Sequence, residues 1–200
     1  MIRRIIPFIL NPHIMFLNYD NVFKFRIIIF FVFLGLFALS FQIGAMSKVG
    51  YDEANNFSND FLSVMNDTDG FGIFANNSVA ALPMIIPGFG IPWGGYIAWS
   101  TGFGFAAIIS TMPGLSDIQP LSILFLSPFG AIEIVAYSIA MSCSFHFVYE
   151  IIKKLKSKIQ IKSILQSQIK PSFIGIGIVL ALLLVAGYLE DYMITLSQAA

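Results

Sequence analysis

Long apolar runs separated by short polar stretches dominate the chain. A helix needs about 20 predominantly apolar residues to cross the hydrocarbon core of a bilayer. By this measure the pattern predicts membrane helices at about 26–46, 73–91, 95–112, 128–150 and 172–194. We therefore expect an all-α fold, a polytopic transmembrane helical bundle with about five crossings, whose transmembrane domain covers residues 26–196.

The second and third predicted helices come from one uncharged stretch, residues 71–116, which prolines and glycines interrupt in its middle. The interrupting residues are Pro87, Gly88, Gly90, Pro92, Gly94 and Gly95. Irregular backbone at membrane depth must be buried in protein rather than exposed to lipid. The pattern predicts a Pro/Gly-broken hairpin, and it leaves open whether the hairpin crosses twice or re-enters on one side.

Three polar or short segments connect the predicted helices. Residues 47–70 are rich in Asp, Asn, Ser and Gly and predict an acidic loop, with a possible short amphipathic helix at 57–65. Residues 121–126 are apolar but too few to cross. Ser127 and Pro128 are typical of a helix N-cap and first helical position. Residues 151–170 predict a lysine-rich amphipathic helix that Pro171 should end.

Composition and charge agree with a membrane protein. The chain is 57% hydrophobic and 11% charged, whereas soluble domains carry about 25% charged residues. Lysines and arginines gather in residues 1–25, an expected interfacial segment, and in residues 151–170. Because basic residues favour the cytoplasmic side, we expect a multi-pass protein of the cell membrane with its N-terminus in the cytoplasm and its C-terminus and residues 47–70 outside.

Polar residues within the predicted helices concentrate in the outer half of the bundle. Charged side chains inside membrane spans are costly and usually face other helices. Glu133 begins a small-residue stripe that allows close helix packing, and Glu190 follows a similar pair, Ala186 and Gly187. The predicted intramembrane polar cluster consists of Gln42, Asn76, Asn77, Glu133 and Glu190. Two interpretations stay open: these groups fix helix packing, or they line a water-filled cavity that binds an ion, a lipid headgroup or a peptide.

Patterns typical of catalysis are missing from the sequence. It contains no GxSxG, HExxH, CxxC or Walker motif, and its two histidines, His13 and His146, are far apart. His146 is expected at the inner interface, and Cys143, the single cysteine, as a packing residue. We therefore expect a protein that is not an enzyme, with no catalytic, cofactor-binding or metal-binding residues. Nucleic acid is not an expected partner.

Three stretches resemble motifs of the stage II sporulation protein M family, membrane proteins of bacteria and archaea. The most specific runs from Ser127 to Glu133 and is similar to the family's Pro-His-Gly-x-x-Glu signature. The others are residues 74–81 and 186–195. Phe129 stands where the family often has His, so no role that rests on that His carries over, whereas Glu133 matches. The resemblance covers residues 20–196.

The resemblance implies a multi-helix membrane protein and, in spore formers, a role in a membrane-remodelling complex that includes a cell-wall hydrolase. Two functions follow as expectations. The first is a non-enzymatic scaffold that binds membrane or peripheral protein partners through residues 47–70 and 151–170, and that can form a homo-oligomer. The alternative is a transporter or permease-like component that uses a polar cavity in the outer half of the bundle.

Overall fold

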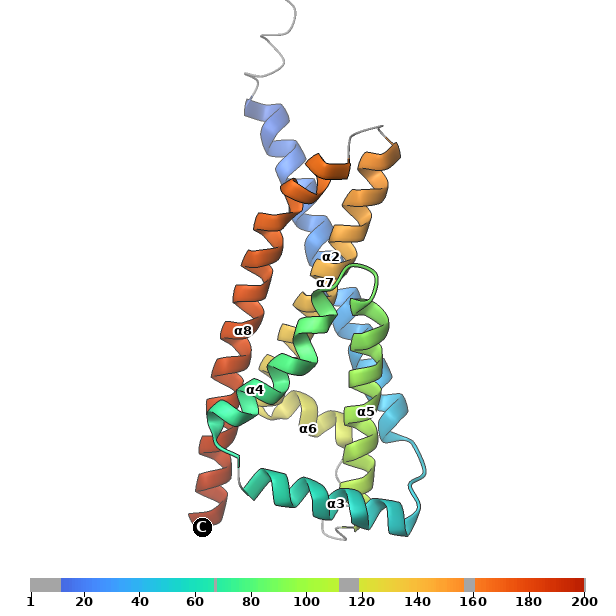
Figure 1. The fold of residues 1–200 in the computed structure, drawn as a ribbon, viewed down its shortest axis with the longest axis vertical. Coiled ribbons are helices and arrows are strands. Elements are labelled where there is room, and N and C mark those ends of the chain that lie inside the picture. The colour runs from blue at the N-terminus through green and yellow to red at the C-terminus, as the bar shows by residue number, and fades with distance from the viewer. Residues whose placement is uncertain (1–11, 67, 112–118, 157–160, 200) are drawn as a thin grey trace, which may run out of the picture.

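The chain folds into seven α-helices and one 3-10 turn over the residues that the computed structural model describes, 12–66, 68–111, 119–156 and 161–199 (Figure 1). The predicted all-α fold is confirmed. The elements are α2 Pro12–Ala45, α3 Tyr51–Asn66, α4 Gly70–Ala81, η2 Leu82–Ile85, α5 Gly90–Thr111, α6 Pro120–Leu126, α7 Pro128–Lys156 and α8 Ile161–Ala199. Residues 1–11 of the expected interfacial segment lie outside the described residues.

Helices α2, α7 and α8 run along the long axis of the molecule (Figure 1). In the described part of the chain, three stretches are long and apolar enough to cross a membrane: Phe23–Ala45, Pro128–Lys153 and Ile169–Ser197. A fourth apolar segment, Gly70–Ile85, is shorter. The structure therefore supports three of the five expected crossings directly, and the other two predicted helices form the hairpin.

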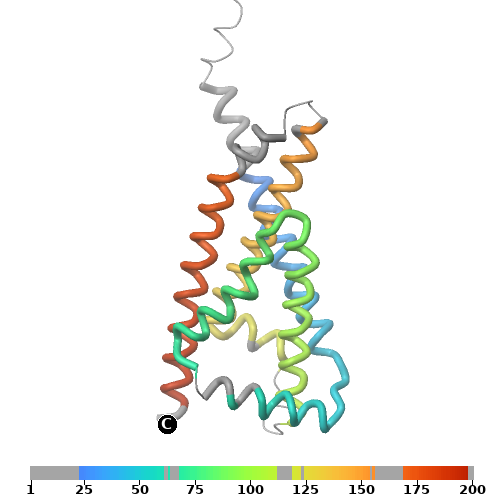
Figure 2. Tube along the Cα trace, in the orientation of Figure 1, coloured from blue at the N-terminus to red at the C-terminus, as the bar shows by residue number. Residues whose placement is uncertain are grey.

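The hairpin consists of α4, η2 and α5. The start of α4 and the end of α5 both lie at the end of the bundle across which α3 lies (Figure 2). Its turn needs glycine, because Gly88 has a φ of 80°. The turn packs against α7, where the Ser144 hydroxyl donates a hydrogen bond of 2.8 Å to the carbonyl oxygen of Ile86. Ser144 precedes Lys153, where the apolar stretch of α7 ends, by about 14 Å of helix. The turn thus lies well inside the length of the bundle.

The core lies where the hairpin packs against α2, α7 and α8. Its buried side chains include Phe33, Phe37, Phe41, Met84, Ala98, Ile134, Tyr137, Met141, Val179 and Leu183. Two glycines let α2 and α5 approach each other backbone to backbone. A Cβ atom at Gly44 would overlap the carbonyl oxygen of Trp99, and one at Gly102 would overlap that of Phe41. Larger residues at these positions would force the two helices apart.

The lysine-rich stretch differs from its prediction. It is no separate helix: α7 continues to Lys156, and α8 begins at Ile161 and passes through Pro171 without ending. The expectation that Pro171 ends a helix is wrong. A proline removes one backbone hydrogen bond, and membrane helices tolerate this loss because neighbouring groups satisfy the freed carbonyl. Residues 157–160 lie outside the described residues.

Other local signals in the sequence agree with the structure. The backbone N–H of Gly130 donates to Ser127 Oγ at 3.2 Å, so Ser127 caps α7 as predicted, and α7 begins at Pro128. Asp69 caps α4 in the same way, through Gly72. The amphipathic helix expected at 57–65 is longer, since α3 covers Tyr51–Asn66. Below, the end of the bundle crossed by α3 is called the acidic end, and the end with Lys24, Lys153 and Lys170 the basic end.

Candidate functional site

Glu133 occupies the acidic half of the bundle, in the second turn of α7. Its position follows from the Ser127 cap, which fixes where α7 begins. The small residues that follow it on the same face, Ala136, Ala140 and Ser144, are completely buried. This face therefore meets other helices at close range, and Glu133 itself is half-buried rather than exposed to lipid.

Asn77 of α4 is the hydrogen-bond partner of Glu133. Its side-chain Nδ2 donates to Glu133 Oε1 at 2.6 Å. The Asp69 cap sets the start of α4, and the packing of α4 along α8 sets its direction. Gly187 permits this packing, because a Cβ atom there would lie 2.7 Å from the carbonyl oxygen of Gly70. The pair thus joins the first arm of the hairpin to α7.

Glu190 of α8 and Tyr137 of α7 complete the site. The carboxyl groups of Glu133 and Glu190 are close enough to act on each other electrostatically, and both act on Tyr137. The Tyr137 ring stacks on Phe37 of α2, with ring centroids 5.4 Å apart. Asn77 of α4 and Glu133 of α7 are thus in contact. Glu190 of α8 is within electrostatic range of Glu133, and Tyr137 contacts α2 through Phe37.

The structure brings two of the five residues of the predicted polar cluster into contact. Asn77 and Glu133 share a hydrogen bond, Glu190 is within electrostatic range of Glu133, and Asn76 is exposed on another face of α4. Gln42 is half-buried on α2, a helix that packs mainly on α5 and α7. Consecutive residues on a helix point about 100° apart, so Asn76 and Asn77 could not both face α7. Shared depth alone does not bring side chains together.

Tyr137 is the member of the site that sequence reasoning missed. Its signal was available, because Tyr137 follows Glu133 by one helical turn and i, i+4 neighbours share a face. The residues present can donate and accept hydrogen bonds and can carry a proton or hold a cation. Within the described ranges, no group of three or more His, Cys, Asp or Glu residues could hold a metal ion.

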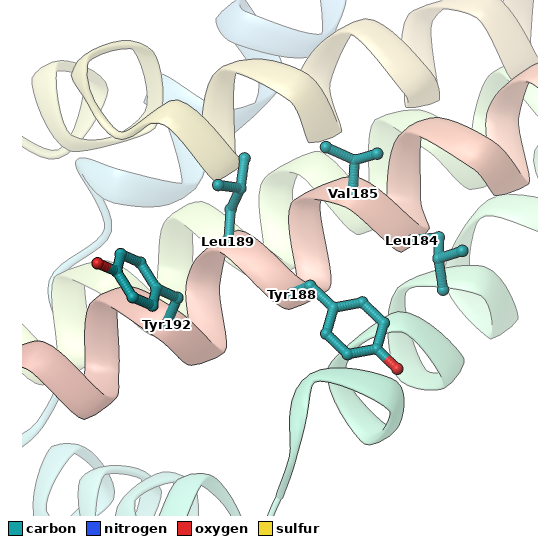
Figure 3. A pocket seen from close by; sticks show the side chains of 5 residues that line it. All are labelled: Leu184, Val185, Tyr188, Leu189 and Tyr192. Atoms are coloured by element: carbon teal, nitrogen blue, oxygen red, sulfur yellow. The ribbon is translucent and has the colours of Figure 1, made fainter.

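A wider hollow lies on the outer side of α8, and its chemistry is different. It has a volume of about 480 Å³ and is lined by Leu184, Val185, Tyr188, Leu189 and Tyr192. Figure 3 shows that all five side chains come from this one helix, and their spacing places them on one broad face of it. Since the lining is aliphatic and aromatic, this groove suits lipid and is not part of the polar site.

Comparison with known proteins identifies one family. The family model described as stage II sporulation protein M matches residues 25–193, nearly the whole chain. The match includes α7 with Glu133, α4 with Asn77 and α8 with Glu190. No curated protein and no solved structure gave a significant match.

Proposed function

Because this chain belongs to the stage II sporulation protein M family, we propose that it is a non-enzymatic scaffold of the cell membrane and a component of a membrane-remodelling complex. One observation carries the proposal. The acidic helix α3 lies across the end of the bundle (Figure 1), and its charged residues Asp52, Glu53 and Asp60 are exposed. A rigidly held charged surface of this kind suits recognition of another protein.

The inner face of α3 is fixed to the bundle by specific contacts. Ala54 and Ser58 are buried, and the Ser58 hydroxyl forms a hydrogen bond of 2.9 Å with the Thr111 hydroxyl at the end of α5. The ring of Phe57 lies so close to Gly104 that a Cβ atom there would be 2.8 Å from it. The outer face carries Asp52, Glu53, Asn56, Asn59 and Asp60, all exposed.

The charge of α3 favours a protein partner over the lipid surface. Helices that lie on membranes usually carry lysine and arginine on their polar face, because many lipid headgroups are anionic. The first turn of α3 instead carries Asp52 and Glu53. Such a surface repels anionic headgroups and attracts a basic patch, which supports a partner with lysines or arginines at its contact surface.

The topology that accompanies this proposal has three full crossings and a re-entrant hairpin. Helices α2, α7 and α8 cross, and α4, η2 and α5 enter and leave at the acidic end. The hairpin turn at Ile86, held by Ser144 inside the length of α7, supports this arrangement. Three crossings, like five, place both basic segments in the cytoplasm, as the charge distribution favours, and α3 and the C-terminus outside.

Charge reversal on α3 tests the scaffold function. A triple variant, Asp52→Lys with Glu53→Lys and Asp60→Lys, leaves the buried residues of α3 unchanged. We expect it to insert and fold normally but to lose its stoichiometric partners when the tagged protein is purified gently from native membranes. The neutral variant D52N/E53Q/D60N should retain part of the association, and added salt should weaken the wild-type complex, because exposed charges are screened.

The matched control is Lys24→Glu, which reverses an exposed charge at the basic end. It should retain the partners that depend on α3. Normal association of the triple α3 variant would contradict the proposal. Charge reversal at Lys153, which also lies at the basic end, tests separately whether the lysine-rich segment is a second docking surface.

The hydrogen-bonded carboxyl group of Glu133 favours one alternative, a transporter or permease-like component. Intramembrane carboxyl groups often mark paths for protons and ions, and Glu133 has Glu190 close by. If this function holds, purified protein in vesicles should conduct protons or take up a solute, and Glu133→Gln should abolish the flux while folding is retained. Flux equal to that of empty vesicles would contradict it.

A further inference from the structure

A second, smaller cavity lies at the basic end, between the three long helices. It has a volume of about 50 Å³ and is lined by Arg26, Cys143, His146, Phe147, Pro171 and Ser172. The lining combines residues of α2, α7 and α8. Unlike the groove on α8, it contains a guanidinium, an imidazole and a thiol, together with the hydroxyl of Ser172.

His146 gives this cavity an unused hydrogen-bonding group. Its Nε2 atom is buried and, among the described residues, has no hydrogen-bond partner. The ring is held by Phe25 of α2, edge to face, with centroids 5.5 Å apart. A buried polar atom without a partner is costly, and such atoms often mark a bound water or ligand. The His146 ring that lines the cavity therefore carries a hydrogen-bonding atom that no described residue uses.

Two lining residues of the cavity lie near the basic ends of apolar stretches. Arg26 is close to the start of the apolar stretch Phe23–Ala45, and Ser172 is close to the start of Ile169–Ser197. The headgroup boundary of a membrane helix is expected near the start of its apolar stretch. Basic pockets between membrane helices at this depth attract the phosphates of anionic lipids.

We propose that this cavity binds the phosphate of an anionic phospholipid. The forked guanidinium of Arg26 would pair with the phosphate oxygens, a geometry for which arginine is well suited. Ser172 and the Nε2–H form of His146 would donate further hydrogen bonds. The cavity, at about 50 Å³, is larger than the roughly 10–15 Å³ that one water needs.

The acyl chains of the lipid would lie against the apolar surface beside the cavity. Phe23 and Phe173 are exposed by 57% and 69%, and they flank Arg26 and Ser172 in the sequence. The bound lipid would thus touch α2, α7 and α8 together and hold their basic ends in one arrangement. This role is independent of the scaffold function and of the Glu133 site.

Lipid binding can be measured on the full-length purified protein after delipidation. Native mass spectrometry would count retained phosphatidylglycerol, with phosphatidylcholine and inorganic phosphate as comparison probes. Arg26→Gln should weaken phosphatidylglycerol binding about tenfold, the effect of losing one charged hydrogen bond. Lys24→Gln, which removes an exposed charge outside the lining, should bind as the wild type does. His146→Phe keeps the ring contact with Phe25 and should also weaken binding.

Each probe has an outcome that would overturn the proposal. Equal binding of phosphatidylglycerol by Arg26→Gln and the wild type would exclude the cavity as the site. Saturation by inorganic phosphate at the same concentration would indicate a site for the free anion. Equally tight phosphatidylcholine binding would remove the selectivity for anionic lipid. If Arg26→Gln does not fold, Ser172→Ala gives the same measurement, and unchanged binding there would count against the site.

Discussion

The side-chain amide of Asn77 donates a hydrogen bond of 2.6 Å to a carboxyl oxygen of Glu133, and this contact joins the hairpin to α7. Asn77 lies in α4 and Glu133 in the second turn of α7, so the bond connects segments far apart in the sequence. Glu133 ends the most specific motif of the chain, and Asn77 belongs to the first arm of the hairpin. The bond therefore helps to hold that arm against its neighbouring helices.

Truncation of Glu133 should therefore destabilise the fold. Glu133→Ala leaves the amide of Asn77 without its acceptor, and a buried donor left unpaired costs about 1–3 kcal/mol. Glu133→Gln keeps an acceptor oxygen of similar shape and removes the repulsion from Glu190, so it should cost less. Unfolding in detergent with increasing denaturant or temperature measures both. Equal losses for Ala and Gln would show that the hydrogen bond is not the cause.

A double-mutant cycle with Asn77→Ala isolates the pair itself. Hydrogen bonds between membrane helices contribute on average about 0.6 kcal/mol, so a coupling free energy of this order is expected. Asn76→Ala is the matched control, because Asn76 is the neighbouring residue but is exposed. A coupling of Glu133 to Asn76 as large as that to Asn77 would contradict the geometry.

The contact between α2 and α5 should be sensitive to a single methyl group. Gly102→Ala places a Cβ atom onto the carbonyl oxygen of Phe41, and overpacking of this kind costs about 1–3 kcal/mol. Gly35→Ala is a control on α2, where a Cβ atom would meet nothing within 4 Å. It should be neutral or stabilise the helix by about 0.5–1 kcal/mol. The two melting temperatures should therefore move apart, and similar melting temperatures would argue against the close approach.

Loss of the α7 cap should be measurable at Ser127. Ser127→Ala removes the oxygen that accepts from Gly130, which should cost about 1 kcal/mol. Ser127→Asn replaces the acceptor and should restore most of the stability. Chemical denaturation of the purified protein compares the three forms. A loss that Asn does not restore would point to packing around Ser127 rather than to capping.

Accessibility of the hairpin turn distinguishes re-entry from crossing. In a Cys143→Ser background, which leaves no native cysteine, single cysteines can replace Pro87 in the turn, Lys153 at the basic end and Asp60 at the acidic end. We expect a membrane-impermeant maleimide to label position 153 only from the cytoplasmic side and position 60 only from outside. Position 87 should react from neither side. Labelling of position 87 together with position 153 would support five crossings.

The sequence predicts the long helices and the Ser127 cap well, because these depend on local patterns. Ser127 and Pro128 mark the start of α7, and the apolar runs mark the three candidate spans. It does not predict how far the hairpin penetrates. That depth depends on Ser144 meeting the Ile86 carbonyl, a contact between residues that no local pattern connects.

The sequence predicts the level along the bundle at which the polar residues lie, but not which of their side chains come together. Residues placed at one level by helix length need not share a face, as Asn76 demonstrates by pointing away from Asn77. Tyr137 shares the face of Glu133 because it follows it by one helical turn, and it also stacks on Phe37 of another helix. Likewise, Pro171 looks like a helix end in sequence, whereas tertiary packing keeps α8 continuous around it.

The uninterrupted course of α8 has a mechanical consequence. Its 39 residues span about 58 Å, almost twice the roughly 30 Å of the hydrocarbon core. One continuous helix therefore connects the lysine-rich segment with the region where Gly187 packs against Gly70 of α4. A tilt or rotation of α8 at its basic end would change this contact with the hairpin at the opposite end of the bundle.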